Sequence, residues 1–337
     1  MSYLRDDIMN SNTQIKELNL IDLKEYILKV HDLEFNLREK INIDEKLLFG
    51  IEIEFSDAVF ETIQMLIAYQ IEKTYKYDRL EKNYSKWCVT NEPSVQKSNI
   101  NNPTNNIIYG GEIISPILSN KKENWLILQR VCNILKENNA RTKKCGGHIH
   151  LNKAYFLNKL VEEKFYENLI LLWYYYEYII YRFGNGDLNH TRLLARKYAK
   201  PINKLYKKED YLDIYDNLNI EQIKLLLKIK KYALRITNYS LEIRNPNGTL
   251  NPVRWQNNIN VFASILETSA NDKLDIEKLK YKIFNREKNN KKKDEISDLL
   301  EFTDLIFNTD IDKMYFLKSY FDTTKVDNKI LKKENQK

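Results

Sequence analysis

The feature that most constrains the fold is a short stretch, residues 47–55, in which apolar and acidic side chains alternate. Its apolar side chains are those of Leu47, Phe49, Ile51, Ile53 and Phe55. Because the side chains of a strand alternate between its two faces, Glu52 and Glu54 share the opposite face at a spacing of about 7 Å. Two carboxylates at that spacing repel each other, so water or cations must accompany them. Taken alone, the pattern favours a solvent-exposed amphipathic strand.

Three later segments repeat this alternation and add polar groups that can carry chemistry. They contribute, in chain order, Glu112, the pair His148 and His150, and the pair Glu242 and Arg244. Glu112 follows two glycines, which let another backbone or a ligand approach closely. A single histidine is more often structural than functional, but four strands that each present such groups on one face favour a shared site.

The order of the expected elements indicates the fold class. Strands are expected at 47–55, 86–92, 107–114, 145–151 and 239–244, and helices at 58–75, 122–138, 156–182, 220–235 and 254–268. Strands separated by long helices can indicate a parallel sheet. The alternating polarity of these strands and the lack of a glycine-rich phosphate loop count against one. We therefore expect an α+β fold with a half-exposed, largely antiparallel sheet.

Three regions of the chain differ in composition and in the spacing of their apolar residues. Residues 1–46 form an N-terminal segment whose part from 12 to 46 reads as a charged, amphipathic helix. Residues 47–270 hold the alternating strands and helices and are expected to form the central domain. Residues 271–337 are lysine-rich and helical, with an apolar helix around 299–307, and we expect them to pack on the same domain.

Composition narrows the choice of partners and compartment. The net charge of +7 comes from 54 basic and 47 acidic residues, with no basic stripe bearing aromatic platforms, so no nucleic-acid partner is expected. Three cysteines are too few for a disulfide framework. The most apolar stretch, 169–181, is interrupted by Glu177 and is too short to cross a bilayer. These features predict a cytoplasmic protein without a membrane partner; they leave the oligomeric state open.

The shared polar face has the chemistry of a cradle for divalent cations and phosphate. Its members are Glu52, Glu54, Glu112, His148, Glu242 and Arg244. A majority of carboxylate oxygens suits Mg²⁺ or Mn²⁺, and Arg244 can offer a forked donor to phosphate. Zinc held by Cys145 and the two histidines is disfavoured, because positions 145 and 150 face opposite sides of a strand and no second Cys/His cluster completes the set.

These motifs, in this order, resemble the amidoligase family, whose relatives include glutamine synthetase and the glutamate–cysteine ligases. The resemblance covers residues 49 to 268 and rests on the segments 49–54, 87–94, 111–116, 145–150, 192–201 and 241–249. It implies a curved, largely antiparallel sheet of the glutamine synthetase catalytic type, with helices packed on one face. It also implies ATP as a substrate and Mg²⁺ as the cation, with Mn²⁺ as a substitute.

The resemblance also implies roles for individual residues. Glu54 and Glu112 would hold one metal, and Glu52, His148 and Glu242 the second. His150 would lie near the nucleotide phosphates, and Arg244 would contact both the nucleotide and the phosphoryl group in transfer. Arg244, Glu242 and Glu54 would thus be catalytic. Glu92, Arg192 and Arg196 would bind the substrate. The family commonly has Asp-x-Ser where this chain has Glu92-Pro93-Ser94, which leaves the role of Glu92 open. The two arginines could instead cap a helix.

The implied reaction follows from charge. A carboxylate is a poor electrophile, so ATP would convert it to an acyl phosphate, which an amine then attacks to give an amide. The substrates would be a small-molecule or peptide carboxylate and an amine. Two alternatives stay open: a metal-dependent hydrolase that uses the same Glu/His face, and a catalytically inactive module that binds metal or nucleotide.

Overall fold

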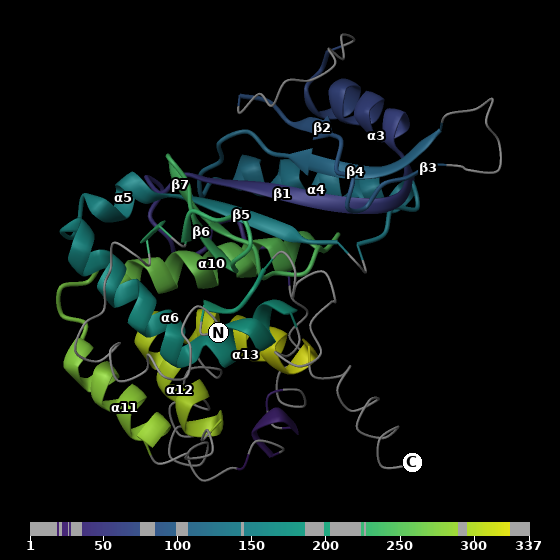
Figure 1. Cartoon of the computed structure of the whole chain (residues 1–337). Helices are drawn as coiled ribbons and strands as arrows, with labels where there is room; N and C mark the ends of the chain where they lie inside the picture. The colour runs from purple at the N-terminus through teal and green to yellow at the C-terminus, as the bar shows by residue number, and fades with distance from the viewer. Residues whose placement is uncertain are drawn as a thin grey trace.

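The computed structural model describes most of the region from residue 36 to residue 323. The described residues are 19, 22–25, 27, 36–74, 85–98, 107–142, 145–185, 199–202, 224–225, 227–288 and 295–323. They form a mixed structure in which one sheet lies above a group of helices (Figure 1). The mixed class agrees with the α+β expectation.

The strands of the described chain form a single antiparallel sheet. They are β1 (Phe49–Val59), β2 (Cys88–Thr90), β3 (Lys97–Ser98), β4 (Ile108–Ile114), β5 (Gly147–Asn152), β6 (Leu234–Ile236) and β7 (Ser240–Ile243). Their order is β2-β4-β1-β5-β7-β6, and the short β3 also pairs with β4. Every pairing is antiparallel, so the expectation of an antiparallel sheet is confirmed.

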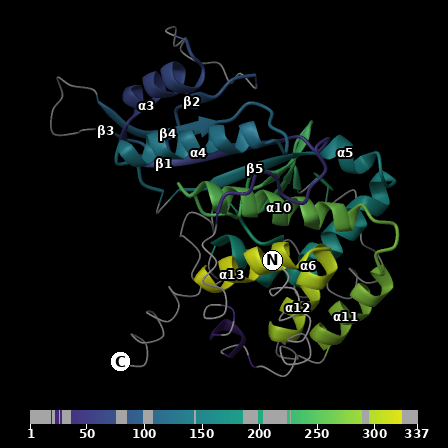
Figure 2. The ribbon, with the colours of Figure 1, turned by 180° about the vertical axis from the view of Figure 1, so that it is seen from behind.

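Helices cover the apolar face of this sheet. The first are α3 (Phe60–Leu66), the π-helix η1 (Ile67–Ile71), α4 (Lys122–Glu137), α5 (Lys153–Leu157) and α10 (Pro252–Ser269). Figure 2 shows α4 and α10 in front of β1 and β5. Phe49 stacks on Trp125 of α4 with ring centroids 5.3 Å apart, and Trp255 of α10 lies against Gly147 of β5. The alternating apolar side chains therefore meet a continuous layer of helix.

A second helical layer packs beneath α10. It consists of α6 (Glu162–Asn185), α11 (Ile276–Lys288), α12 (Glu295–Ile306) and α13 (Asp310–Thr323). Aromatic pairs join its members, such as Phe183 of α6 with Phe316 of α13, whose ring centroids are 4.9 Å apart. The apolar stretch 169–181 is the buried middle of α6. Among the helices that the structure describes, none combines the length and the apolar run needed to cross a membrane.

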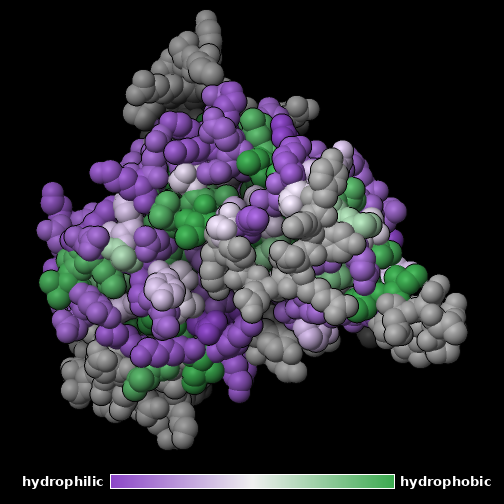
Figure 3. Space-filling view, turned by 90° about the horizontal axis from the view of Figure 1, so that it is seen from above, coloured by the Kyte–Doolittle hydropathy of each residue, from purple (hydrophilic) through white to green (hydrophobic). Residues whose placement is uncertain are grey.

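One face of the molecule is visible in Figure 3, which views it from the side where α3 and β2 lie in Figure 1. Hydrophobic residues there form small groups separated by hydrophilic ones. Met65 of α3 and Tyr69 of η1 are among the large apolar side chains that are exposed in the described chain. Scattered apolar groups of this kind are normal on a protein surface.

The prediction of a helix over residues 220–235 is wrong at its carboxyl end. Residues 234–236 form β6, which pairs with β7 along the edge of the sheet. Within the described residues before it, only 224–225 and 227 are helical. The strand is more stable than a helix here, because its pairing with β7 adds backbone hydrogen bonds and buries Leu234 and Ile236.

The prediction of a helix over residues 12–46 is also wrong at its carboxyl end, since residues 36–46 contain no helix. The amide of Asn120 holds this segment instead. It accepts a hydrogen bond from the Ile41 N–H at 3.0 Å and donates to the carbonyls of Ile41 and Ile43 at 2.7 and 2.9 Å. Tertiary hydrogen bonds thus replace the ones that a helix would supply. The remainder of 12–46 lies largely outside the described residues.

The same segment is anchored to α13 by an ion pair whose carboxylate, that of Asp312, is buried and whose guanidinium is partly buried. Arg38 Nη1 donates to Asp312 Oδ1 at 2.7 Å, and Asn260 donates to that oxygen at 2.8 Å. Asp312→Ala leaves the guanidinium without its counter-ion, so we expect the free energy of unfolding to fall by about 3 kcal/mol. Chemical denaturation measures this change.

Asp304→Ala is the matched control, because its ion pair with Lys313 at 2.6 Å is largely exposed. Its expected cost is below about 1 kcal/mol. Equal losses for the two variants would show that the Arg38–Asp312 pair does not hold the N-terminal segment in place.

Candidate metal-binding site on the polar face of the sheet

Strand register places the polar side chains of four strands in one cluster. Direct cross-strand pairs are Glu54 with Glu112, Glu52 with His148, and His150 with Glu242. Directly paired residues point to the same face, so these side chains meet without any long loop. The face opposite carries the apolar side chains described above. We call the cluster of Glu52, Glu54, Glu112, His148, His150, Glu242 and Arg244 the polar face.

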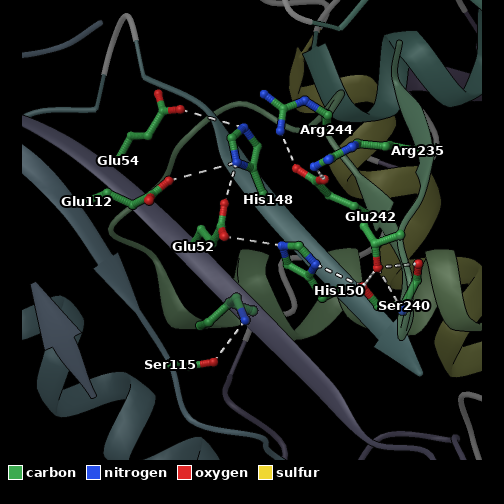
Figure 4. Close-up of polar contacts among 12 residues, drawn as sticks. Glu52, Glu54, Glu112, Ser115, His148, His150, Arg235, Ser240, Glu242 and Arg244 are labelled. Carbon is green, nitrogen blue, oxygen red and sulfur yellow. Dashed lines mark hydrogen bonds and ion pairs between the residues drawn. The ribbon is translucent and has the colours of Figure 1, made fainter. Parts of the chain in front are cut away.

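Glu52 lies at the centre of the polar face, between the two histidines (Figure 4). Its Oε2 is 2.8 Å from His148 Nδ1, and its Oε1 is 3.3 Å from His150 Nε2. Burial alone would raise the pKa of the Glu52 carboxyl, but its contacts with the two histidines outweigh burial and hold that pKa well below its usual range. Burial would likewise lower the pKa of His150, and Glu52 outweighs it, so that pKa is raised.

Two further carboxylates surround the ring of His148. Its Nε2 is 3.6 Å from Glu54 Oε1, and its Nδ1 is 3.9 Å from Glu112 Oε1. Glu54 Oε2 also accepts a hydrogen bond from the backbone N–H of Gly146. His148, Glu54 and Glu112 are all buried. Three carboxylates thus converge on one imidazole in a region with little access to water.

Glu242 is held from two sides by arginines. Arg244 Nη1 donates to its Oε1, and Arg235 Nη1 of β6 donates to its Oε2 at 2.8 Å. Burial raises the pKa of Glu242, but the charge of Arg244 and then the histidines outweigh it, so the pKa is lowered. Glu242 and Arg244 are both buried, which makes this pair far more costly to break than a surface pair.

Two groups on the polar face have donor atoms close enough to hold a metal ion. The groups are Glu52, His150 and Glu242, and Glu52, Glu112 and His148. Neither includes a cysteine. The sequence resemblance divides the ligands differently, since it pairs Glu54 with Glu112 and joins His148 to Glu52 and Glu242. In the structure His150 is the nearer imidazole to Glu242, because β5 and β7 pair those two residues directly.

Charge also favours a cation. Four carboxylates face only two guanidinium groups, so acidic side chains outnumber the arginines of the site. In addition, Nε2 of His150 is buried and has no aligned hydrogen-bond partner within the described chain. A donor set of carboxylate oxygens with imidazole nitrogen fits Mg²⁺ or Mn²⁺.

Of the three residues expected to bind substrate, the described chain contains Glu92, which does not join the polar face. Glu92 follows β2, and its carboxylate accepts a hydrogen bond from the Ser94 N–H at 3.1 Å within a local turn. Arg192 and Arg196 lie outside the described residues. Substrate binding by these three residues therefore stays a prediction.

Sequence reasoning missed two residues that support the site. Arg235 was assigned to a helix, so its pairing with Glu242 was not foreseen. The alternation of Leu234, Arg235 and Ile236 before a Thr-Asn turn is the signal that marks a strand there. Ser240 was the other, and its hydroxyl lies 3.1 Å from Nδ1 of His150.

Comparison with known proteins gives one family. A family model described as "Putative amidoligase enzyme" matches residues 45–266, more than half of the chain. The matched region contains every residue of the polar face, and it confirms the resemblance found in the motifs. No curated protein matches the chain at a significant level. The family match indicates a ligase-type enzyme.

Close packing under the site predicts which glycines tolerate a side chain. A Cβ on Gly147 would lie 2.7 Å from the ring of Trp255 and 3.2 Å from the carbonyl of Asn247. Gly147→Ala should therefore destabilise the protein by about 1–3 kcal/mol and displace His148. Gly50→Ala is the matched control on the neighbouring strand, because its nearest contacts are 3.7 and 3.8 Å. Thermal unfolding with equal losses for both would contradict this account.

Proposed function

Because the chain belongs to the amidoligase family, we propose that it is an ATP-dependent ligase that joins a carboxylate to an amine. The γ-phosphoryl group of ATP would pass to the carboxylate, and the amine would then displace phosphate from the acyl phosphate. The products would be an amide, ADP and phosphate. We further propose that the antiparallel sheet is of the glutamine synthetase catalytic type.

The observation that supports this proposal most is the composition of the polar face. Four carboxylates, two imidazoles and the guanidinium of Arg244 converge from four neighbouring strands over a packed apolar floor. Acyl-phosphate chemistry needs cations beside the phosphate oxygens and a fixed donor near the transferred group. The polar face offers groups of both kinds within one cluster.

The residues present fit a divalent cation on three counts: oxygen-rich donors, more carboxylates than arginines, and a buried imidazole nitrogen without an aligned hydrogen bond. Glu52, Glu54, Glu112, Glu242 and the histidines are the residues that would hold Mg²⁺. When bound, Mg²⁺ would neutralise charge on phosphate oxygens.

Arg244 is suited to stabilise charge that develops during transfer. Its guanidinium is buried and one of its nitrogens is fixed by Glu242. A preorganised donor needs little reorganisation when negative charge appears beside it. Arg235 holds the other oxygen of Glu242, so the carboxylate stays neutralised even if Arg244 also serves a phosphoryl group.

The function is tested by incubating the protein with ATP, Mg²⁺ and a panel of amino acids and amines. We expect ADP release that depends on a carboxylate and an amine together, with an amide product detected by mass. Glu54→Gln should abolish it, since the amide oxygen can still accept the Gly146 N–H but one charge is lost. Cleavage of an amide or ester substrate by water without ATP would indicate a hydrolase, and no turnover with any substrate would indicate an inactive module.

Arg244→Lys tests the proposed role of the guanidinium. Lysine keeps the charge but loses the forked donor geometry. If Arg244 acts mainly as charge develops, the maximal rate should fall at least about tenfold while the affinity for ATP changes less than about threefold. Steady-state kinetics together with calorimetry of ATP binding measure both quantities.

Arg235→Lys is the matched control, because Arg235 contacts the same carboxylate from the exposed edge of the sheet. It should reduce the rate less than Arg244→Lys does. If the two variants lose the same factor, Arg244 acts only through Glu242 and has no separate contact with the phosphoryl group.

A further inference from the structure

A glycine in the last turn of α6 makes room for a side chain that directly follows the polar face in the sequence. Gly184 lies within α6, where glycine is less favourable than alanine. Its φ is not positive, so it is not the left-handed glycine that ends many helices. A Cβ at this position would lie 2.5 Å from Asn245 Nδ2 and 3.2 Å from Asn245 Cγ. The absence of a side chain therefore lets the Asn245 amide lie against the helix.

The last turns of α6 hold the chain that follows Arg244 by two hydrogen bonds. Asn245 is fully buried, and its Nδ2 donates to the Ile180 carbonyl at 3.1 Å. The backbone N–H of Asn247 donates to the Gly184 carbonyl at 2.8 Å. A buried side-chain amide has no water to replace a lost partner, so the bond to Ile180 strongly favours this one position. Asn245 is thus fixed to α6.

Arg244 depends on this attachment because it lies where the chain leaves the sheet. β7 ends at Ile243, and the N–H of Arg244 donates to the Ala233 carbonyl at 2.7 Å. The next residue, Asn245, is held by α6. The backbone of Arg244 therefore lies between two fixed partners, one beside the sheet and one in the helix. Its guanidinium, which donates to Glu242, is carried by a backbone whose direction these partners set.

We propose that Asn245 is a positioning residue that keeps Arg244 in the orientation required for phosphoryl transfer, through its hydrogen bond to α6. This inference rests on the proposed function, because Asn245 would act only through Arg244. A donor that stabilises charge in a transition state must be in place before the charge develops, and small displacements of such a group are costly. If Asn245 only stabilised the fold, its loss would lower stability and leave the kinetics unchanged.

Asn245→Ala removes the hydrogen bond to Ile180 and leaves Arg244 in the chain. We expect the maximal rate of ADP release to fall about tenfold, while the affinity for ATP changes less than about threefold. Steady-state kinetics and calorimetry of ATP binding measure the two quantities. Parent-like kinetics in Asn245→Ala would overturn the proposal.

Asn168→Ala is the matched control, because it removes the same kind of bond from another part of α6. Asn168 is buried, and its Nδ2 donates to the Ser269 carbonyl at 2.9 Å. Like that of Asn245, its Oδ1 is buried without a hydrogen-bond partner among the residues that the structure describes. The control should lose a similar amount of stability, measured by thermal unfolding, and keep the parent rate. An equal loss of rate in the control would show a general effect of stability and contradict the positioning role.

Gly184→Ala tests the same contact without removing any hydrogen-bonding group. Its methyl group has to displace the Asn245 amide. We expect the same fall in maximal rate with little change in ATP affinity, and this variant carries the test if Asn245→Ala does not fold. Parent-like kinetics in Gly184→Ala would show that the position of the amide does not control Arg244.

A double-mutant cycle shows whether Asn245 acts through Arg244. The effects of independent residues on the rate multiply. If Asn245 only positions the guanidinium, Asn245→Ala should lower the rate of an Arg244→Lys protein by less than about threefold. A further loss of about tenfold would mean that Asn245 acts separately from Arg244, which contradicts the proposal.

The last readout needs no turnover. In the full-length protein with ¹⁵N-labelled arginine, the Nε–H signal of Arg244 is assigned by its loss in Arg244→Lys. Because Arg244 is buried and paired with Glu242, its guanidinium hydrogens should exchange slowly with water. The exchange rate should rise at least about tenfold in Asn245→Ala and stay unchanged in Asn168→Ala. An unchanged rate in Asn245→Ala would overturn the positioning role.

These measurements separate the two proposals. Exchange rates that follow this pattern in a protein that never releases ADP would support the positioning of Arg244 and reject the ligase. A protein that forms an amide from ATP, yet shows the same Arg244 exchange rate with and without the Asn245 amide, would support the ligase and reject the positioning.

Discussion

Repulsion among carboxylates is the constraint on which the site depends. Glu52 and Glu54 lie two positions apart on β1, and the register with β4 brings Glu112 directly beside Glu54. Burial of these side chains raises the cost of leaving them uncompensated. These charges are balanced by imidazoles on β5 and by the guanidinium groups of Arg235 on β6 and of Arg244, which directly follows β7. So many buried carboxylates are stable together only where a cation or these side chains balance their charge. The polar face differs in this respect from an ordinary amphipathic strand, whose acidic side chains are exposed to water.

Much of the polar face could be predicted because strand periodicity is local. The alternation in residues 47–55 is visible within nine positions, and it placed Glu52 and Glu54 on one face opposite the core side chains. What periodicity does not contain is the register between strands. Which carboxylate each histidine contacts depends on the pairing of β1 with β5 and of β5 with β7, and these segments lie about a hundred residues apart in the sequence. A shift of two residues between β1 and β5 would keep every side chain on its face, yet it would place His150 opposite Glu52 in place of His148.

Tertiary contacts explain the places where local patterns misled. Residues 36–46 contain many helix-forming side chains, yet the Asn120 amide and the pair of Arg38 with Asp312 hold them in another conformation. Residues 234–236 follow a helical pattern in sequence and still join the sheet, because the edge of β7 offers them hydrogen bonds. In both cases the deciding partner is remote in sequence or lies across a turn. Propensity is a weak guide where such partners compete.

The distribution of charge across the polar face has a consequence for how substrates would be oriented under the proposed function. Glu54 and Glu112 lie on β1 and β4, the arginines lie on β6 and directly after β7, and the histidines of β5 lie between them (Figure 4). The face is therefore negative at one end and carries its positive side chains at the other. An anionic phosphoryl group is favoured towards β7, where Arg244 is fixed, and a cation is favoured over β1 and β5. A positively charged amine would be attracted to the end formed by β1 and β4. The pairing between neighbouring strands fixes the positions of these side chains above the apolar core. The direction of the charge gradient is therefore determined by the register of the sheet.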